Sequence, residues 1–146
     1  MAKQFEDYFS EIQADMVALC LEYASNNADD IYIYCSFEAN MYVFNVFFKI
    51  ENVVVRKHEL NKVSPMYDTC LERQEALIDN GLADLELIHD KCQKFNHDMP
   101  TEMKLHYNVK ENSLKGKYKY ELVYSNHETL SPNDIFNQWM KEIKNK

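Results

Sequence analysis

Apolar residues near the start of the chain recur at steps of three and four, the spacing of one buried helix face. This pattern predicts a helix over residues 3–25. From residue 30 onward apolar and polar positions alternate, which predicts strands at 30–37, 42–50 and 53–59 joined by short turns. Connections this short cannot cross over to form parallel neighbours, so the three strands predict an antiparallel meander.

A second helical pattern covers residues 66–95, and two starts for it compete. Either Ser64 caps it with Pro65 in the first helical position, or Thr69 and Glu72 form a capping box. Gly81 on its apolar face indicates a close crossing over the sheet or a kink. The residues predicted to form its buried face are Cys70, Leu71, Leu77, Ile78, Leu85, Ile88, Cys92 and Phe95, with Leu82 at the rim.

The last third of the chain predicts a β-hairpin, with strands at 102–110 and 115–124, followed by a helix over 132–144. Ser131 is its expected N-cap, because Pro132 suits the first helical position. This helix is predicted to bury Ile135, Phe136, Trp139, Met140 and Ile143. The order α-β-β-β-α-β-β-α predicts an α+β fold in one domain over residues 1–146, with helices packed on an antiparallel sheet.

Composition is consistent with one packed domain, because 46% of the 146 residues are hydrophobic. The four cysteines show no CxxC pairing and fall on apolar faces, so we expect reduced, buried thiols. The acidic, amphipathic start does not resemble a secretory signal. No run reaches the ~18 apolar residues of a membrane span. A cytoplasmic location is therefore expected.

The net charge of −8 is unevenly distributed. Residues 1–30 contain seven acidic residues and one lysine, and residues 68–90 contain seven acidic residues and one arginine. Residues 103–120 instead contain five lysines and one glutamate. An acidic surface repels phosphate backbones and attracts basic proteins, so direct nucleic-acid binding is disfavoured.

One acidic stripe on the long helix is the candidate partner-binding site. At about 100° per residue its members lie largely opposite the buried face. The ordinary interpretation is a solvated outer face. However, the stripe contains few bases at salt-bridge spacing, which favours docking of a basic partner, although the lysine-rich hairpin could also meet it. The predicted partner-binding residues are Asp68, Glu72, Glu75, Asp79, Glu86 and Asp90.

Tyr32 and Tyr34 form a second candidate surface, because they point to the face opposite Ile31 and Ile33. If uncovered, this face would be an aromatic interface patch. The alternative is that a helix covers it, so that the sheet is buried on both sides.

Little in the chain predicts catalysis. His89, Cys92, His97 and Asp98 are possible zinc ligands, but structural zinc sites usually pair their ligands in two knuckles. A core cysteine beside two half-exposed histidines explains the same residues. We expect no catalytic residue, no metal and no cofactor.

Three segments resemble the YezG-like immunity proteins of bacterial polymorphic toxin systems: Pro100 to Val109, Lys117 to Asn126 and Ser131 to Trp139. Tyr67 to Gln74 fits the same family. The resemblance implies a cytoplasmic, non-enzymatic antitoxin that binds a cognate toxin domain, often a nuclease. The acidic balance fits such a partner, because a nuclease cleft must be positive to hold phosphates.

Two alternatives stay open. The chain could be an adaptor or regulatory module whose partner is not a toxin. It could also be a small hydrolase that uses carboxylates or the His89, Cys92 and His97 cluster. No membrane partner is expected, and the sequence leaves the oligomeric state open.

Overall fold

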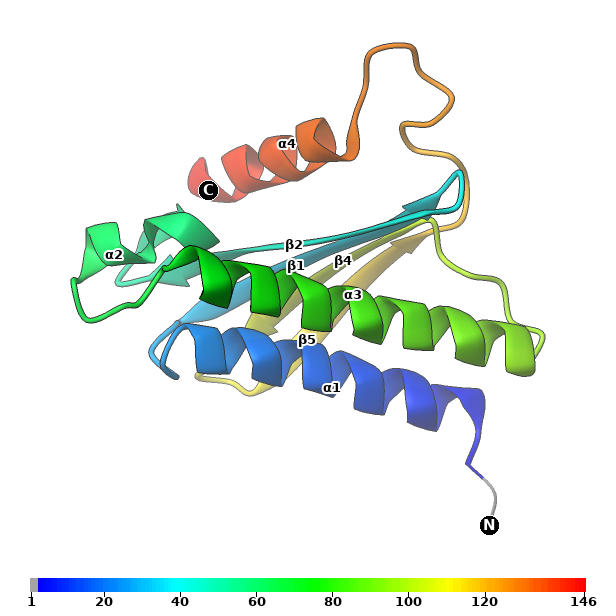
Figure 1. Ribbon diagram of the computed structural model, residues 1–146, viewed down its shortest axis with the longest axis horizontal. Coiled ribbons are helices and arrows are strands. Elements are labelled where there is room, and N and C mark those ends of the chain that lie inside the picture. Colours follow the sequence, from blue (N-terminus) through cyan, green and yellow to red (C-terminus); the bar gives the residue numbers. More distant parts are fainter. Residues whose placement is uncertain (1–2) are drawn as a thin grey trace.

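A computed structural model describes residues 3–146 (Figure 1). Within that range the predicted α+β class and element order are confirmed, with one short helix added after the third strand. The elements are α1 (Phe5–Tyr23), β1 (Asp30–Glu38), β2 (Met41–Ile50), β3 (Val53–Arg56), the 3₁₀ turn η1 (Lys57–Glu59), α2 (Leu60–Val63), α3 (Leu71–Lys94), β4 (Glu102–Asn108), β5 (Ser113–Lys119) and α4 (Pro132–Lys144).

The strands form one sheet in the order β3-β2-β1-β4-β5, and every neighbouring pair is antiparallel. Both residues of the β1–β2 turn, Ala39 and Asn40, have positive φ, as do Glu51 and Asn52 between β2 and β3. That backbone conformation matches the twist of two-residue hairpins. The predicted meander is therefore confirmed, and β1 lies at the centre between β2 and β4.

Helices cover the sheet on both sides (Figure 1). Ile31 and Ile33 of β1 pack with α1 and α3 in the larger core. Tyr32 and Tyr34 point to the other side and pack with Phe47 of β2 beneath α4. The residues that α4 contributes to this second core are Phe136, Trp139 and Met140, with Ile135 and Ile143 at its margin. The tyrosine face is thus buried, and it is not an open interface patch.

The third strand is shorter than predicted. β3 ends at Arg56, whose backbone N–H donates to Glu59 Oε1 at 2.9 Å as the chain turns into η1 and α2. The expected strand over 53–59 therefore gives way to a turn after Arg56. A carboxylate that reaches back three residues competes with strand pairing, and here it prevails.

The long helix begins later than either predicted start, because its N-cap is Cys70 and its first residue is Leu71. Both predictions, Ser64 with Pro65 and Thr69 with Glu72, are therefore wrong. Cys70 and Leu71 are also exposed, contrary to the prediction that they are buried. The buried residues of the helix begin six positions later, at Leu77, and continue with Leu85, Ile88 and Cys92.

Gly81 allows α3 to cross β2 closely. A Cβ at this position would overlap the ring of Phe44 on β2. The helix continues unbroken through Gly81, so the predicted close crossing is confirmed and the kink is not observed.

The chain after β5 passes around the end of the sheet to the opposite face (Figure 1). β5 ends at Lys119, so the predicted strand over 115–124 extends too far. Tyr120 and Leu122, which we expected in that strand, are exposed. Tyr124 is buried, and its hydroxyl lies 2.9 Å from Ser36 Oγ.

Glu38 at the end of β1 holds this crossing segment. Its buried carboxylate accepts hydrogen bonds from the backbone N–H groups of Val123, Tyr124 and Ser125 at 2.9, 3.4 and 3.1 Å, and from Ser125 Oγ at 2.7 Å. Burial acts to raise the pKa of Glu38, but these hydrogen bonds outweigh it and the pKa is lowered. The segment then leads into α4, where Ser131 Oγ accepts from Asp134 N–H, which confirms the predicted cap.

Among residues 3–146, no helix has the length and apolar character needed to cross a membrane.

Candidate partner-binding surface

The predicted acidic stripe lies on the solvent side of α3, with one exception. Glu72, Glu75, Asp79, Glu86 and Asp90 are all on the helix and exposed. Asp68 is also exposed, but it precedes the helix, so its predicted place in the stripe is wrong. It accepts the Cys70 N–H at 3.0 Å, which holds a turn before the helix and lowers the pKa of Asp68.

Within the described part of the chain, none of these six carboxylates belongs to an ion pair. The bases of α3 lie at its two ends and have other contacts. Arg73 donates to the carbonyl oxygen of Tyr23 at 3.2 Å. Lys91 Nζ lies 4.0 Å from the centroid of the Tyr8 ring. The middle of α3 therefore presents negative charge that its own lysines and arginine do not pair.

α1 lies antiparallel beside α3 and extends the acidic surface (Figure 1). It contains five acidic residues and no basic one, and α3 contains six acidic and three basic residues. With every carboxyl group counted as ionised, the two helices together have a formal net charge of −8, equal to that of the whole chain. We call their outer face the α1–α3 surface. It concentrates the negative potential of the protein on one side.

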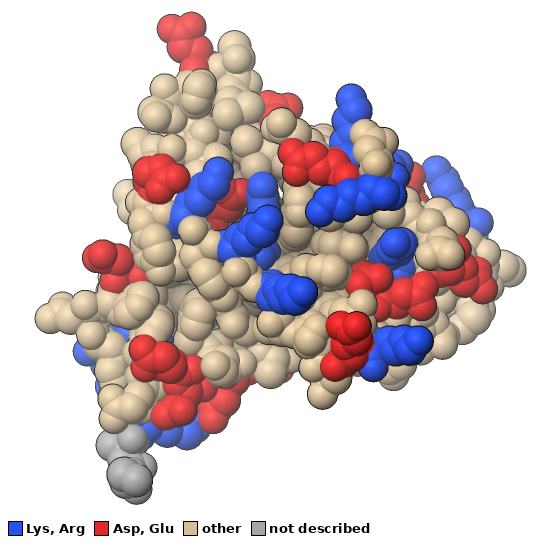
Figure 2. Space-filling view, turned by 180° about the vertical axis from the view of Figure 1, so that it is seen from behind, with Lys and Arg blue, Asp and Glu red and all other residues tan. Residues whose placement is uncertain are grey.

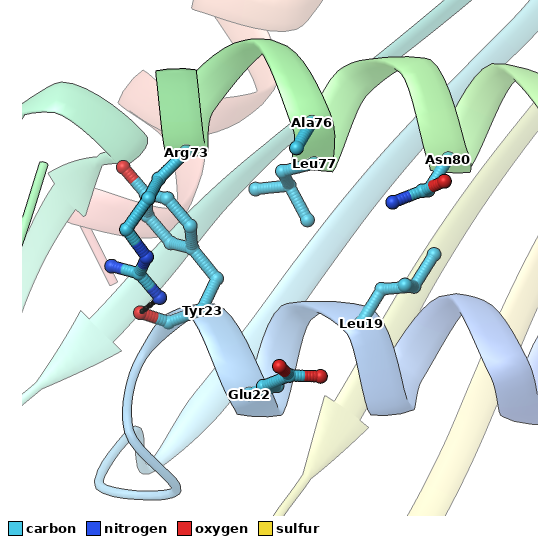
Figure 3. Close-up of a pocket in the computed structure, with 7 residues that line it drawn as sticks. All are labelled: Leu19, Glu22, Tyr23, Arg73, Ala76, Leu77 and Asn80. Carbon is cyan, nitrogen blue, oxygen red and sulfur yellow. Dashed lines mark hydrogen bonds between the residues drawn. The ribbon is translucent and has the colours of Figure 1, made fainter. Parts of the chain in front are cut away.

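A small cleft opens between these helices at the Tyr23 end of α1 (Figure 3). Its volume is about 130 Å³. Leu19 and Leu77 point into it from the two helices, Glu22 lies at its edge, and the guanidinium of Arg73 closes one end. The cleft therefore combines an apolar floor with a carboxylate at its edge and a guanidinium at one end.

Apolar residues also lie on the outer side of α3. At about 100° per residue, Ala76, Ala83 and Leu87 fall between the acidic stripe and the side of α3 that meets α1. All three are exposed, and Leu87 has 42% of its surface open to solvent. Protein interfaces commonly place an apolar centre inside a polar rim. The α1–α3 surface has this composition.

Asp84 of α3 contacts Asp15 of α1 between the helices. Burial, followed by the hydrogen bond and the charge of Asp15, raises the pKa of Asp84 from 3.8 to about 7. Asp84 Oδ2 is buried, and no N–H or hydroxyl group of the described residues donates to it. Two carboxyl groups can form a hydrogen bond with each other only when one of them is protonated. The Asp15–Asp84 pair therefore holds a shared proton near neutral pH.

The possible zinc ligands do not converge. His89 Nδ1 lies 2.6 Å from the hydroxyl of Tyr42, and Cys92 is buried in the main core. His97 stacks on the ring of Phe5, with 4.0 Å between ring centroids. No group of three or more metal-ligating side chains lies together anywhere in residues 3–146. The residues that their spacing suggested as a zinc site therefore lie apart, and each has a separate contact within the fold.

The lysine-rich hairpin does not meet the acidic stripe. Lys104 and Lys119 instead lie 3.4 and 3.7 Å from the carboxylate oxygens of Glu102 on the same hairpin. β5 is the sheet edge beneath α1, where Gln13 Nε2 donates to the hydroxyl of Tyr118 at 2.8 Å. α3 lies over β2, on the far side of β1.

Comparison with known proteins leaves the family open. The chain matches no protein-family model and no curated protein.

Sequence reasoning missed part of the α1–α3 surface, including Leu19, Glu22, Ala76, Ala83 and Leu87. The exposed position of Leu87 could have been found on a helical wheel, because it falls outside the buried stripe. The cleft could not have been found in this way. It depends on Leu19 of α1 facing Leu77 of α3, and three strands separate these two helices in the sequence.

Proposed function

We propose that this protein is an immunity protein that binds a cognate secreted toxin domain, a nuclease, through the α1–α3 surface. The binding blocks the basic cleft of the toxin. The observation that carries the proposal is the concentration of charge, because two neighbouring helices hold a net −8 with no ion pair to the stripe among residues 3–146. The resemblance of residues 100–139 to YezG-like proteins supports the same class of partner.

Physical chemistry links this surface to such a partner. A nuclease must hold phosphates, so its active cleft is positive, and a field of opposite sign raises the rate of encounter. The exposed residues Ala76, Ala83 and Leu87 supply apolar contact once the charges have aligned the two surfaces.

The first experiment identifies the toxin. The product of the neighbouring upstream gene is expressed in bacteria with and without this protein. We expect that its C-terminal domain is basic, stops growth alone, and is neutralised and co-purified when both are present. A neighbour that is not toxic, or whose toxicity this protein leaves unchanged, would count against the proposal.

The second experiment locates the interface. Glu75, Asp79 and Glu86 are changed together to lysine, which should slow association with the toxin by about ten- to a hundredfold at low salt. The matched control changes three exposed acids elsewhere, Glu111→Lys with E121K and E128K, and so alters the net charge equally. Stopped-flow association across a salt series distinguishes them, because only the stripe variant should lose its salt dependence.

Equal slowing in both variants would mean that net charge acts without a defined interface. Wild-type rates in the stripe variant would mean that the stripe is a solvated face. Far-ultraviolet circular dichroism confirms that both variants fold.

A further inference from the structure

A basic groove lies on the opposite side of the molecule from the α1–α3 surface. It is formed where the outer face of β4 and β5 meets the last turns of α4, and its volume is about 200 Å³. Figure 2 shows the molecule from this side, with Lys and Arg side chains across the middle of the face and Asp and Glu side chains among them. The residues that line it include Lys104, His106, Lys115, Lys117, Trp139 and Ile143.

The strand register places basic side chains opposite each other in this groove. Lys104 of β4 is directly opposite Lys117 of β5, and His106 is directly opposite Lys115. Because these positions alternate by two, all four side chains lie on the same face of the sheet. Like charges directly opposite one another destabilise a strand pair. A multivalent anion bound between them would remove that repulsion.

Two carboxylates, one buried and one partly buried, hold part of this cluster in place without neutralising all of it. Glu102 is 2% exposed and lies 3.4 Å from Lys104 Nζ, and Asp30 Oδ1 lies 2.7 Å from His106 Nε2. Lys115 and Lys117 have no carboxylate within ion-pair distance in residues 3–146. The groove therefore keeps two unpaired ammonium groups beside a lysine and a histidine of fixed position.

The other wall of the groove has two apolar residues of α4 together with Glu142 and Lys146. Trp139 and Ile143 face it from α4, and Lys104 Nζ lies 5.7 Å from the centroid of the Trp139 ring. Glu142 also lies at the wall and provides an acceptor for a hydroxyl or amino group. A ligand that fits must combine an anionic group with a flat apolar body and polar edges.

We propose that this groove binds a mononucleotide, with its phosphate among Lys104, Lys115 and Lys117 and its base against Trp139 and Ile143. A phosphate monoester has close to two negative charges near neutral pH, whereas a carboxylate has one, so it better offsets opposed lysines. A second copy of this chain is a poor occupant, because edge-to-edge pairing of β5 would bring its lysines together. This site is independent of the immunity function proposed above.

The chain contains one tryptophan, so the fluorescence of Trp139 reports directly on the groove. The full protein is titrated with adenosine monophosphate, with inorganic phosphate and with adenosine. We expect a saturable change with the nucleotide, weaker binding of phosphate, and no saturation with adenosine at the same concentrations. Changing Lys115 and Lys117 together to glutamine should weaken nucleotide binding at least about tenfold, since each removes a charge-assisted hydrogen bond.

The matched control is Lys62→Gln with Lys110→Gln, two exposed lysines outside the groove, and it should bind as the wild type does. Three outcomes would overturn the proposal: no saturation with the nucleotide at millimolar concentration, equal affinity for adenosine, or unchanged affinity in the K115Q/K117Q variant. Saturation with inorganic phosphate as tight as with the nucleotide would also refute the base contact with Trp139. Because no toxin is present in this assay, its failure leaves the toxin experiments unaffected.

Discussion

Asp84→Asn should stabilise the protein above neutral pH, because it removes a carboxyl group that folding holds in an unfavourable place. The pKa of Asp84 is raised from 3.8 to about 7 by burial and by Asp15. A raised carboxyl pKa means that the native state keeps a proton that the unfolded state has lost. The free energy of unfolding therefore falls as pH rises from about 4 to about 7, and stays reduced above that.

The magnitude follows from the two pKa values. At 1.36 kcal/mol per pKa unit, the full difference corresponds to roughly 4 kcal/mol. Asp84 is only partly buried, so solvent screening reduces this to about 1–2 kcal/mol. In Asp84→Asn the amide nitrogen can donate to the Asp15 carboxylate and keep the contact. We expect the variant to unfold roughly 3–6 °C higher than the wild type at pH 8.

Thermal and urea unfolding at pH 4 and pH 8 test this prediction. Asp79→Asn is the matched control, because it removes the same charge from an exposed position on α3. It should change stability by only a few tenths of a kcal/mol at either pH. Asp84→Asn should differ from the wild type at pH 8 and converge with it at pH 4. Equal effects of the two variants at pH 8, or a gain independent of pH, would refute the shared proton.

Three further predictions concern packing. Glu38→Gln should lower the free energy of unfolding by about 1–3 kcal/mol in urea unfolding. Because the pKa of Glu38 is lowered by folding, its carboxylate stabilises the native state only while ionised, and the variant should therefore lose less stability at acid pH than the wild type. Gly81→Ala should lower the free energy of unfolding by roughly 1–3 kcal/mol, because the new Cβ overlaps the ring of Phe44. The same substitution in an exposed helix would instead raise it by about 1 kcal/mol. Removal of the chain from Ser131 onward should give insoluble or molten protein without near-ultraviolet circular dichroism, and an unchanged melting temperature would contradict the burial of α4.

Periodicity predicted the elements of this fold because each has a strong local cause. The two-residue spacing from Ile31 to Ile50 specified strands, and the turns at 39–40 and 51–52 were too short for anything but antiparallel pairing. Ser131 and Pro132 specified the start of α4, since the cap and the fixed φ of proline act within one turn.

Ends of elements were less predictable, since local hydrogen bonds compete there with regular structure. Glu59 reaching Arg56 ends β3, and Asp68 reaching Cys70 delays α3. Such competition depends on the geometry of a few side chains, and the apolar pattern does not encode it.

The acidic stripe shows the same division between local and tertiary information. The charges of the stripe, and its position on the solvent side of α3, follow from the helical spacing of these residues in the sequence. Whether those charges are paired depended on which elements became neighbours, and Lys104, Lys115 and Lys117 of the hairpin lie on the α4 side of the sheet, away from α3.

The sequence by itself determined most of the elements, their order, the antiparallel pairing within the meander and within the C-terminal hairpin, and the uneven charge, because these depend on residues close together in the chain. The tertiary structure decided the surfaces. The placement of α4 over Tyr32 and Tyr34, the cleft between Leu19 and Leu77, and the pairing of β1 with β4 all join distant residues. Contacts across such separations depend on how helices pack on the sheet and on strand register, and both are properties of the whole chain.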